Sequence, residues 1–479
     1  MALNLYQARA TRPLIKNPFF QRTLQGFAIL VLICLLIIAW GREALPGIPD
    51  RWPLIYTNAT TLIFWVIWFM GLVLTIPLLG RLWCAICPLG YITERFAKMG
   101  RAAPWPRGWG GWLGMVIVFL TGMGGALYWD VHKSPHATAI FVGIATLFAA
   151  LSGLLWRGAP FCKLFCPVGV VLSLYCRFSP VKVGALNPDR CGSCDDHACV
   201  KRKTSWRRWT IAGKSFHRKL STGGCPVGLY PPKMDATRCQ LCLACLRSCP
   251  SENLGLFYGS RPGGAKLSTP ALILLVLLTG LVTSALARTW PSFSIAITPS
   301  INPSGRLTSI WIGFILPIVI IFAPALVGAL TTMLSGREVS SPYDAKIAGR
   351  ENLWAVTRRA AVPFIGPLLG GHMALALVKI NAKALYLAYL PYDPTGAETY
   401  LAIHVADTLP LPDMVLPLSL LRWLALLVLG CGVVAGLFEM KRSWKPLPGN
   451  ISRFFGVASY FSLSIVFAAL LHHWLFPGR

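Results

Sequence analysis

Nine apolar stretches dominate the chain, and each is long enough to cross a bilayer as a helix. A hydrocarbon core of about 30 Å takes roughly 20 helical residues. Only 13% of the 479 residues are charged, against about 25% in an ordinary soluble protein. We therefore expect an all-α polytopic membrane protein with nine transmembrane helices. The stretches lie at 24–40, 57–80, 111–129, 137–156, 268–288, 308–334, 360–380, 416–438 and 453–476.

The basic residues are unevenly distributed between the loops. A formal charge of +28 would suggest a nucleic-acid partner in a soluble protein. Lys and Arg instead concentrate in alternate loops, at 81–107, 337–359 and 441–453, whereas loops such as 130–133 are poor in them. By the positive-inside rule this predicts a multi-pass protein of a bacterial inner membrane, with a cytoplasmic N-terminus and a periplasmic C-terminus. We expect membrane lipid as a partner and no nucleic acid.

A single long polar stretch, residues 157–267, follows the fourth apolar stretch and is therefore predicted to be cytoplasmic. Of the 15 cysteines, 13 lie between Cys84 and Cys249. Cytosolic disulfides are uncommon, so this density indicates metal binding or redox chemistry. We predict a four-helix membrane unit at 1–156, a small metal-stapled cytoplasmic domain at 157–267, and a five-helix membrane unit at 268–479.

The most specific motif is Cys239-x2-Cys242-x2-Cys245-x3-Cys249-Pro250. This is the bacterial ferredoxin run, in which three closely spaced thiolates bind one 4Fe–4S cluster and the fourth ligates a second cluster. Zinc sites instead favour separated CxxC pairs. The motif predicts a ferredoxin-like cytoplasmic insert.

A second set of cysteines lies upstream, ending in Cys225-Pro226. It departs from the usual run by a wider gap before Cys199 and by a 25-residue insertion before Cys225. The usual crossing of ligands between two clusters predicts which cysteines share a cluster. Cluster one takes Cys191, Cys194, Cys199 and Cys249, and cluster two takes Cys239, Cys242, Cys245 and Cys225. We therefore expect two 4Fe–4S clusters.

An approximate internal repeat carries a different cysteine motif. Cys84-x2-Cys87-Pro88 follows the second apolar stretch, and Cys162-x3-Cys166-Pro167 follows the fourth. The two halves could bring four thiols together at the cytoplasmic membrane edge. These four cysteines are candidate redox-active residues, either as a dithiol relay or as a soft-metal site, since thiolates select Cu(I), zinc or iron–sulfur centres. The alternative is that each Cys-Pro only ends a helix, with the thiols as apolar fillers.

Two further features bear on partners and cofactors. The basic segment at 201–219 is either a solvated loop beside anionic lipid or a dock for an acidic cytoplasmic electron carrier. A bilayer haem usually needs paired axial ligands, and only His372 falls in the middle of an apolar stretch. We therefore expect no haem, and consider His372 or the pair His472 and His473 as contacts of a possible quinone.

The ferredoxin run, the paired Cys-Pro motifs and the four-span frame resemble the NapH/NosR-type membrane polyferredoxins, a family related to CcoG. The resemblance covers about residues 20–256. In that family the paired motif is CxxxCP, which Cys162 to Pro167 match, whereas Cys84 to Pro88 are one residue shorter. Residues 268–479 fall outside the matched part, and the flavin-bearing domain of the NosR branch is not found.

These features predict a membrane-bound electron-transfer protein. A core of about 30 Å is too thick for one efficient electron hop, so a quinone, a partner subunit or another cofactor must bridge it. The resemblance implies coupling of the quinone pool or a cytoplasmic donor to a periplasmic redox enzyme or its maturation. The alternatives are a copper reductase or cuproenzyme assembly factor, in which the Cys-Pro pairs handle metal, and a transporter with regulatory iron–sulfur clusters.

Overall fold

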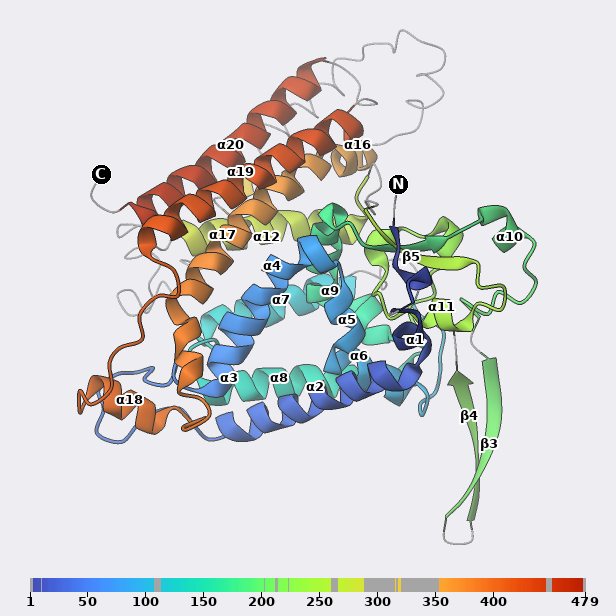
Figure 1. Ribbon diagram of the computed structural model, residues 1–479, viewed down its shortest axis with the longest axis horizontal. Helices are drawn as coiled ribbons and strands as arrows, with labels where there is room; N and C mark the ends of the chain where they lie inside the picture. Colours follow the sequence, from blue (N-terminus) through green and yellow to red (C-terminus); the bar gives the residue numbers. More distant parts are fainter. Residues whose placement is uncertain are drawn as a thin grey trace.

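The computed structural model describes residues 3–9, 11–106, 113–201, 203–211, 214–222, 224–259, 266–287, 315, 318–319, 353–444 and 450–476. In these ranges, long helices form a bundle with a small domain at one end (Figure 1). The N-terminus lies beside the small domain, and the last helix ends at the opposite end of the bundle. The two ends of the helix bundle therefore differ, since the small domain lies at one of them.

The first membrane unit is built from apolar helices that begin after capping residues. Asn17, Asn58 and Ser134 each accept a hydrogen bond from the first turn of the helix that follows, and so satisfy backbone donors that the helix leaves unpaired. The span at 59–79 passes from α to π geometry and back. The helices are α2 (Pro18–Ala39), α3 (Ala59–Thr61), the π-helix η2 (Leu62–Trp68), α4 (Phe69–Leu79), α7 (Leu113–Tyr128) and α8 (Pro135–Leu155).

The second membrane unit lies against α4 on one side and extends to the far end of the bundle (Figure 1). Its central helix, α17, is almost entirely buried among its neighbours. The elements are α12 (Thr269–Ala287), α16 (Leu353–Ala360), η8 (Val362–Phe364), α17 (Ile365–Lys383), η9 (Ala384–Ala388), α18 (Ala397–His404), α19 (Leu418–Ser443) and α20 (Asn450–Leu475).

Seven helices in the described ranges are long and apolar enough to cross a membrane. They match seven of the nine predicted spans. The third predicted span, 111–129, corresponds to the shorter apolar helix Leu113–Ala126. The sixth, 308–334, lies almost wholly outside the described residues. The chain is therefore mostly helical and compatible with a multi-pass membrane protein.

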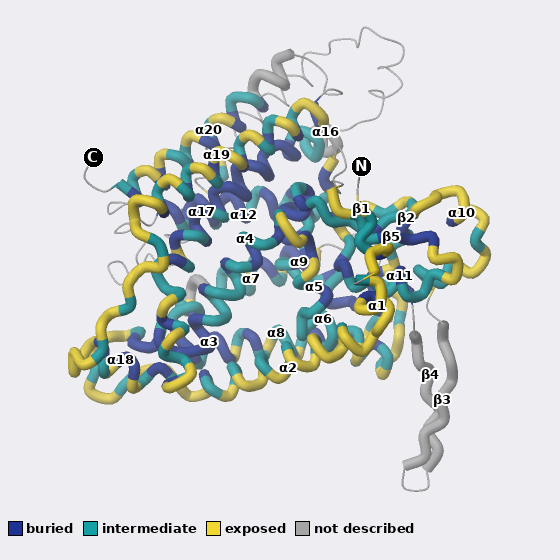
Figure 2. The backbone as a smooth tube through the Cα atoms, viewed as in Figure 1, coloured by how far each residue is buried: buried dark blue, intermediate teal, exposed yellow. Residues whose placement is uncertain are grey.

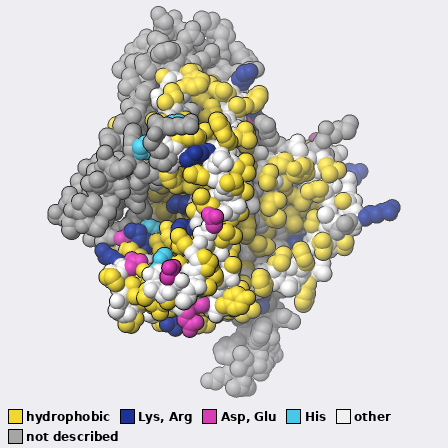
Figure 3. Space-filling view, turned by 60° about the vertical axis from the view of Figure 1, so that its left-hand side comes forward, with side chains coloured by type: hydrophobic (Ala, Val, Ile, Leu, Met, Phe, Trp, Pro, Cys, Tyr) yellow, Lys and Arg dark blue, Asp and Glu magenta, His cyan; other side chains and the backbone are white. Residues whose placement is uncertain are grey.

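The outer faces of these helices are apolar and exposed, as lipid-facing surfaces must be. Leu30 and Ile37 on α2 are 58% and 70% exposed, and Ile144 on α8 is 63% exposed. Figure 2 shows α2 largely exposed along its length, and Figure 3 shows hydrophobic side chains covering most of one face, with few charges. Surfaces this apolar mark a lipid or protein contact in any chain.

Glycines allow α17 and α19 to pack backbone against backbone. A Cβ placed on Gly366 would stand 2.4 Å from the carbonyl oxygen of Gly432, and one placed on Gly432 would stand 2.8 Å from the Cα of Gly370. Such small-residue stripes are typical of transmembrane helix pairs, because dispersion contacts replace the hydrophobic effect in lipid.

Each cysteine pair of the internal repeat is followed by a short helix that starts at proline. The first pair leads through α5 (Leu82–Ile86) into α6 (Pro88–Ala97). The second leads through the π-helix η4 (Phe161–Phe165) into α9 (Pro167–Tyr175) and η5 (Cys176–Phe178). Proline suits the first helical position, where its missing N–H costs nothing.

The small domain contains a three-stranded antiparallel sheet in the order β1-β5-β2. β2 (Lys182–Ala185) pairs with β5 (Leu254–Tyr258) through Lys182 opposite Phe257, and β1 (Leu3–Asn4) covers the other edge of β5. The hairpin of β3 (Lys203–Ile211) and β4 (Lys214–Thr222) projects from the domain (Figure 1). Short helices complete it: α10 (Pro188–Gly192), η6 (Pro231–Lys233), η7 (Ala236–Arg238) and α11 (Ala244–Ser248).

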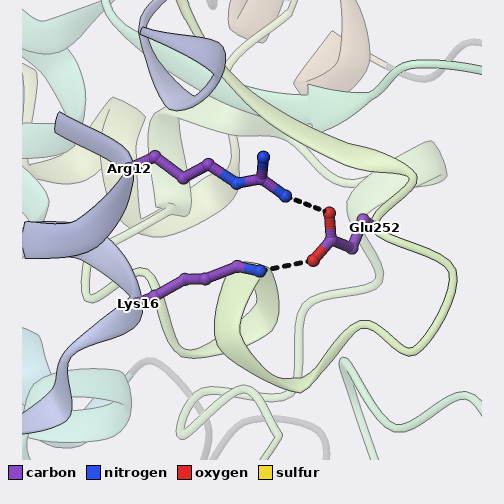
Figure 4. A network of polar contacts seen from close by, with 3 residues as sticks. All are labelled: Arg12, Lys16 and Glu252. Atoms are coloured by element: carbon purple, nitrogen blue, oxygen red, sulfur yellow. Dashed lines mark hydrogen bonds and ion pairs between the residues drawn. The ribbon is translucent and has the colours of Figure 1, made fainter. Parts of the chain in front are cut away.

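The first residues of the chain are built into this domain rather than into the membrane bundle. Tyr6 in η1 (Leu5–Gln7) and Ile15 in α1 (Thr11–Lys16) are buried in the domain core with Leu246 and Leu254. Arg12 and Lys16 both pair with the Glu252 carboxylate (Figure 4). The start of the chain thus ties α2 to the small domain.

Candidate functional site

The ferredoxin run folds into a tight loop that ends in α11. Leu241 and Leu243 have positive φ angles of 50° and 58°, a conformation that bulky residues rarely adopt. The Arg247 guanidinium donates to the Cys242 carbonyl oxygen at 2.9 Å and also contacts Gln21 and the Ile15 carbonyl oxygen. The strained turn brings the cysteines of the run close together and is fixed from outside by α1 and α2.

One group of cysteines in the small domain comprises Cys225, Cys239, Cys242 and Cys245. Burial, followed by the neighbouring Cys225 thiol, raises the pKa of the Cys239 thiol to about 11. Cys245 interacts electrostatically with all three other members of the group. The backbone N–H of Leu229 donates to the Cys225 sulfur at 3.4 Å. The predicted ligand set of cluster two is therefore gathered in one place.

A second group comprises Cys191, Cys194, Cys199 and Cys249. Burial, followed by the neighbouring Cys249 and Cys191 thiols, raises the pKa of the Cys199 thiol to about 11. Asn253 donates its side-chain amide to the Cys191 sulfur at 3.3 Å. The backbone N–H of Cys225 donates to the Cys199 carbonyl oxygen at 2.9 Å, which links the two groups. The predicted ligand set of cluster one is thus also gathered.

The four thiols of the internal repeat meet where the bundle joins the small domain. The short helix of each repeat packs on the span of the other: α6 packs on α8, and α9 packs on α4. Cys162 consequently lies within electrostatic range of Cys166, Cys87 and Cys84. We call Cys84, Cys87, Cys162 and Cys166 the membrane-edge thiols; all four are free and partly exposed.

Arg81 is the cation of this site and was not identified from the sequence as buried. It is 5% exposed, donates from Nη2 toward the Cys84 sulfur at 3.8 Å, and from Nη1 to the Thr237 carbonyl oxygen at 3.2 Å. Thr237 lies two residues before Cys239. Arg81 therefore connects the membrane-edge thiols directly to the small domain.

A cavity of about 560 Å³ opens beside the membrane-edge thiols and is lined by basic residues. Cys162 forms part of its wall. The Lys163 ammonium lies 3.2 Å from the centre of the Trp105 ring and donates to the Val227 carbonyl oxygen. Burial, followed by the positive charge of Arg238, lowers the pKa of Lys163 to about 8. The lining includes the cations Arg81, Arg157, Lys163 and Arg238.

A second, mostly apolar cavity of about 420 Å³ lies inside the bundle. His372, Lys379 and Lys383 contribute its polar lining together with Tyr56 and His132. His372 also lines a smaller cavity of about 50 Å³, whose wall reaches Pro167, the residue after Cys166. Four residues line both cavities: Phe69, Met123, Leu281 and His372. The two cavities are therefore neighbours, and the smaller one lies against the start of α9.

His372 is held by a polar partner that the sequence did not reveal. Its Nδ1 lies 2.9 Å from the Tyr175 hydroxyl, at the end of α9. His472 stacks on Phe476, and neither His472 nor His473 lines the apolar cavity. The structure thus brings one of the three candidate histidines to a cavity. The two residues are 197 positions apart in the chain, so no local sequence pattern could have revealed the contact.

Within the described ranges, no group of three or more His, Cys, Asp or Glu side chains is placed to hold a metal ion. The chain matches the model of a family described as a 4Fe-4S binding domain, over residues 61–106 and again over 138–185. Each match covers one copy of the internal repeat with its cysteine pair. No curated protein and no solved structure matches the chain. The match and the apolar helices indicate a membrane iron–sulfur electron-transfer protein.

Proposed function

We propose that this protein relays electrons between the two cysteine groups of the small domain and a lipid-soluble quinone in the apolar cavity. Each group would hold one 4Fe–4S cluster, since four thiolates satisfy such a cluster. The observation that carries the proposal is an unbroken series of contacts between these places. The series runs from the small domain through the membrane-edge thiols to the cavity around His372.

The first contacts join the two cluster sites. Cys199 and Cys225 belong to different groups and share a backbone hydrogen bond. The next contacts lead to the membrane, because Arg81 donates to the Thr237 carbonyl oxygen, two residues before Cys239, and also toward the Cys84 sulfur. An electron that arrives at either cluster is therefore brought, by short steps, to the edge of the bundle.

The last step follows α9. This helix begins after Cys166 and ends at Tyr175, which contacts His372. The cavity wall is mostly apolar and carries a few polar groups, the arrangement typical of sites for small cofactors. A quinone combines an apolar tail with a polar ring, so both parts of the cavity match it. His372 and Lys379, which line the cavity, would orient the ring and exchange protons with it, and the Tyr175 hydroxyl would hold His372 in place.

The orientation of the relay follows from the charge asymmetry of the loops. With the small domain in the cytoplasm, a cytoplasmic donor would deliver electrons there, and an acidic carrier would be drawn to the basic hairpin β3–β4. A periplasmic redox enzyme, or its maturation, would use the quinone-linked electrons. The localisation that this requires is a bacterial inner membrane.

Quinol-dependent reduction of the clusters tests the proposal. Protein in lipid nanodiscs is mixed anaerobically with a water-soluble quinol, and the cluster absorbance is followed. Ala285→Phe places a ring in the cavity that Ala285 lines and should slow reduction at least tenfold. Ile144→Phe places the same ring on the lipid-exposed face of α8 and should leave the rate unchanged. Equal rates in both variants would refute the cavity as the quinone site.

A copper reductase or assembly function is supported by one observation, the four membrane-edge thiols beside a basic cavity. Thiolates select Cu(I), and reduction by the neighbouring clusters would produce it. This candidate predicts stoichiometric copper in purified protein that is lost in Cys84→Ala and Cys162→Ala. Copper that remains in both variants would exclude it.

A further inference from the structure

The membrane-edge thiols form a site of their own, separate from the two cysteine groups of the small domain. Each copy of the repeat contributes two cysteines, so the four come from two equivalent halves. Both 2Fe–2S and 4Fe–4S clusters are held by four thiolates. The ligand number and type thus suit a third centre.

Two glycines at equivalent positions keep the space between the cysteine pairs open. Gly90 and Gly169 each lie three residues after the second cysteine of their pair. A Cβ on Gly90 would stand 3.5 Å from the Cys162 sulfur and 3.8 Å from the Cys87 Cβ, between the two pairs. A Cβ on Gly169 would stand 3.6 Å from the Cys166 sulfur and 3.2 Å from Arg81 Nη2. A side chain at either position would lie directly against a cysteine sulfur.

The charges around the thiols favour a bound anion, and a cluster with four thiolate ligands is anionic. Cys87 and Cys166 cap the N-termini of α6 and α9, where backbone N–H groups attract negative charge. The Gly169 N–H donates to the Cys166 sulfur at 3.3 Å. Arg81 adds a full positive charge, and its Nε has no hydrogen-bond partner. Donors to the sulfurs and nearby cations are the means by which proteins tune cluster potentials.

We infer that Cys84, Cys87, Cys162 and Cys166 hold a third iron–sulfur cluster, which carries electrons between the small domain and the apolar cavity. The inference deepens the proposed relay and rests on it. A dithiol would exchange electrons in pairs, whereas the clusters of the small domain pass them singly. In the inferred step the cluster of Cys225 and Cys239 loses one electron and the third cluster gains it. No bond forms or breaks.

The decisive experiment counts iron and acid-labile sulfide in the full-length protein purified anaerobically. Two 4Fe–4S clusters account for about eight of each per chain. A third cluster raises both counts to about ten if it is 2Fe–2S, or to about twelve if it is 4Fe–4S. A wild-type count of about eight that Cys87→Ala and Cys166→Ala leave unchanged overturns the inference, and so does copper or zinc bound at the site in place of the additional iron.

Variants then assign the additional iron to the site. Cys87→Ala and Cys166→Ala should each lower the count to about eight, with loss of one Mössbauer component and retention of the other two. Cys176→Ser is the matched control, because Cys176 also lies on the α9 segment and its hydrogen bonds to Ser173 and Thr237 carbonyl oxygens suit a serine. It should keep the full count. An unchanged count in both alanine variants overturns the assignment.

Failure of the inference can be told apart from failure of the relay. Cys242→Ala removes a predicted ligand from the small domain only. If the small domain holds no clusters, the wild-type iron count falls below eight and the proposed relay fails. If it holds both clusters and the membrane edge holds none, the count is about eight and the relay must use the thiols without iron.

Discussion

The two copies of the internal repeat differ by one residue between their cysteines, yet they deliver the cysteines to equivalent places. In the first copy, α5 spans the pair as an ordinary helical turn. In the second, η4 is a π-helix, and the Cys166 N–H donates to the Phe161 carbonyl oxygen five residues back. A π turn contains one residue more than an α turn, so it accommodates the one-residue insertion between the second pair of cysteines. Both Cys-Pro steps therefore still begin a helix.

A second correspondence lies upstream of each pair. Gly80 and Gly158 both precede the first cysteine by four residues and have φ angles of 61° and 86°. Each lies against the small domain: Gly80 near Ser179 and Leu241, and Gly158 near Pro226. The copies differ in charge, however, since Arg81 corresponds to Ala159. The backbone geometry is thus repeated, whereas a buried arginine directly after this glycine is found in the first copy alone.

The largest expected effect concerns the membrane orientation of the two repeat copies. If both copies run the same way, cytoplasmic reporters fused after residue 230 should be active and those after residues 133 and 479 inactive, since the loop charges alternate. Periplasmic reporters should give the opposite pattern. Activity of one reporter type after both 133 and 230 would mean that the two copies do not share an orientation.

Next in size is the loss of electron transfer. Cys84→Ala and Cys162→Ala, one from each copy, should lower quinol-dependent electron delivery to an added acceptor by at least tenfold and to the same extent, while the spectra of the clusters in the small domain stay normal. Cys34→Ala and Cys431→Ala, on exposed helix faces, should match the wild type. If only one of the two variants lowers electron delivery, the two cysteine pairs do not form a single site.

A smaller effect is expected on stability at the paired glycines. Gly80→Ala meets only the flexible Ser179 hydroxyl at 3.0 Å, and its positive φ should cost about 1–3 kcal/mol. Gly158→Ala adds a clash with the Pro226 carbonyl oxygen at 2.3 Å and should cost more. The thermal midpoint for loss of cluster absorbance should fall in that order. The reverse order would contradict a close contact between Gly158 and the Pro226 carbonyl oxygen.

The smallest expected effect comes from the difference in charge between the two repeat copies. Arg81→Met removes a buried cation beside Cys84 and should lower the reduction potential of the centre at the membrane-edge thiols, because less positive charge stabilises the reduced form. Lys163→Met removes a half-exposed cation of the second copy and should shift it less, since solvent screens its charge. Redox titration measures both. A larger shift in reduction potential for Lys163→Met would mean that Lys163, and not Arg81, has the stronger electrostatic effect on the centre.

Much of this protein could be predicted from local patterns. Apolar run length located seven of the helices that the structure shows, because a spanning helix needs a minimum length and few charges. Cysteine spacing indicated iron–sulfur chemistry, and the repeat around Cys84 and Cys162 reappears in the two matched segments. The roles of the individual cysteines, the membrane orientation and the domain boundaries remain predictions.

Other features depended on contacts between distant residues, which no local pattern records. The first residues, which the charge pattern placed before a membrane span, pack into the small domain through Tyr6 and Ile15. Burial of Arg81 and the contact of Tyr175 with His372 arise only when α9 packs between α4 and α12. The short helix α9 itself fell below the length that predicts a span.

The sequence by itself determined the apolar spans, the cysteine spacings and the one-residue difference between the two repeats, because each depends on residues close together in the chain. The repeat predicted that the four membrane-edge thiols could come together, and only the tertiary structure decided the helix packing that brings them near one another. That outcome requires α6 to pack on the span of the second copy and α9 on the span of the first. Such an exchange depends on helix packing over a separation of about 80 residues in the sequence, where side-chain shape rather than local propensity selects the partner.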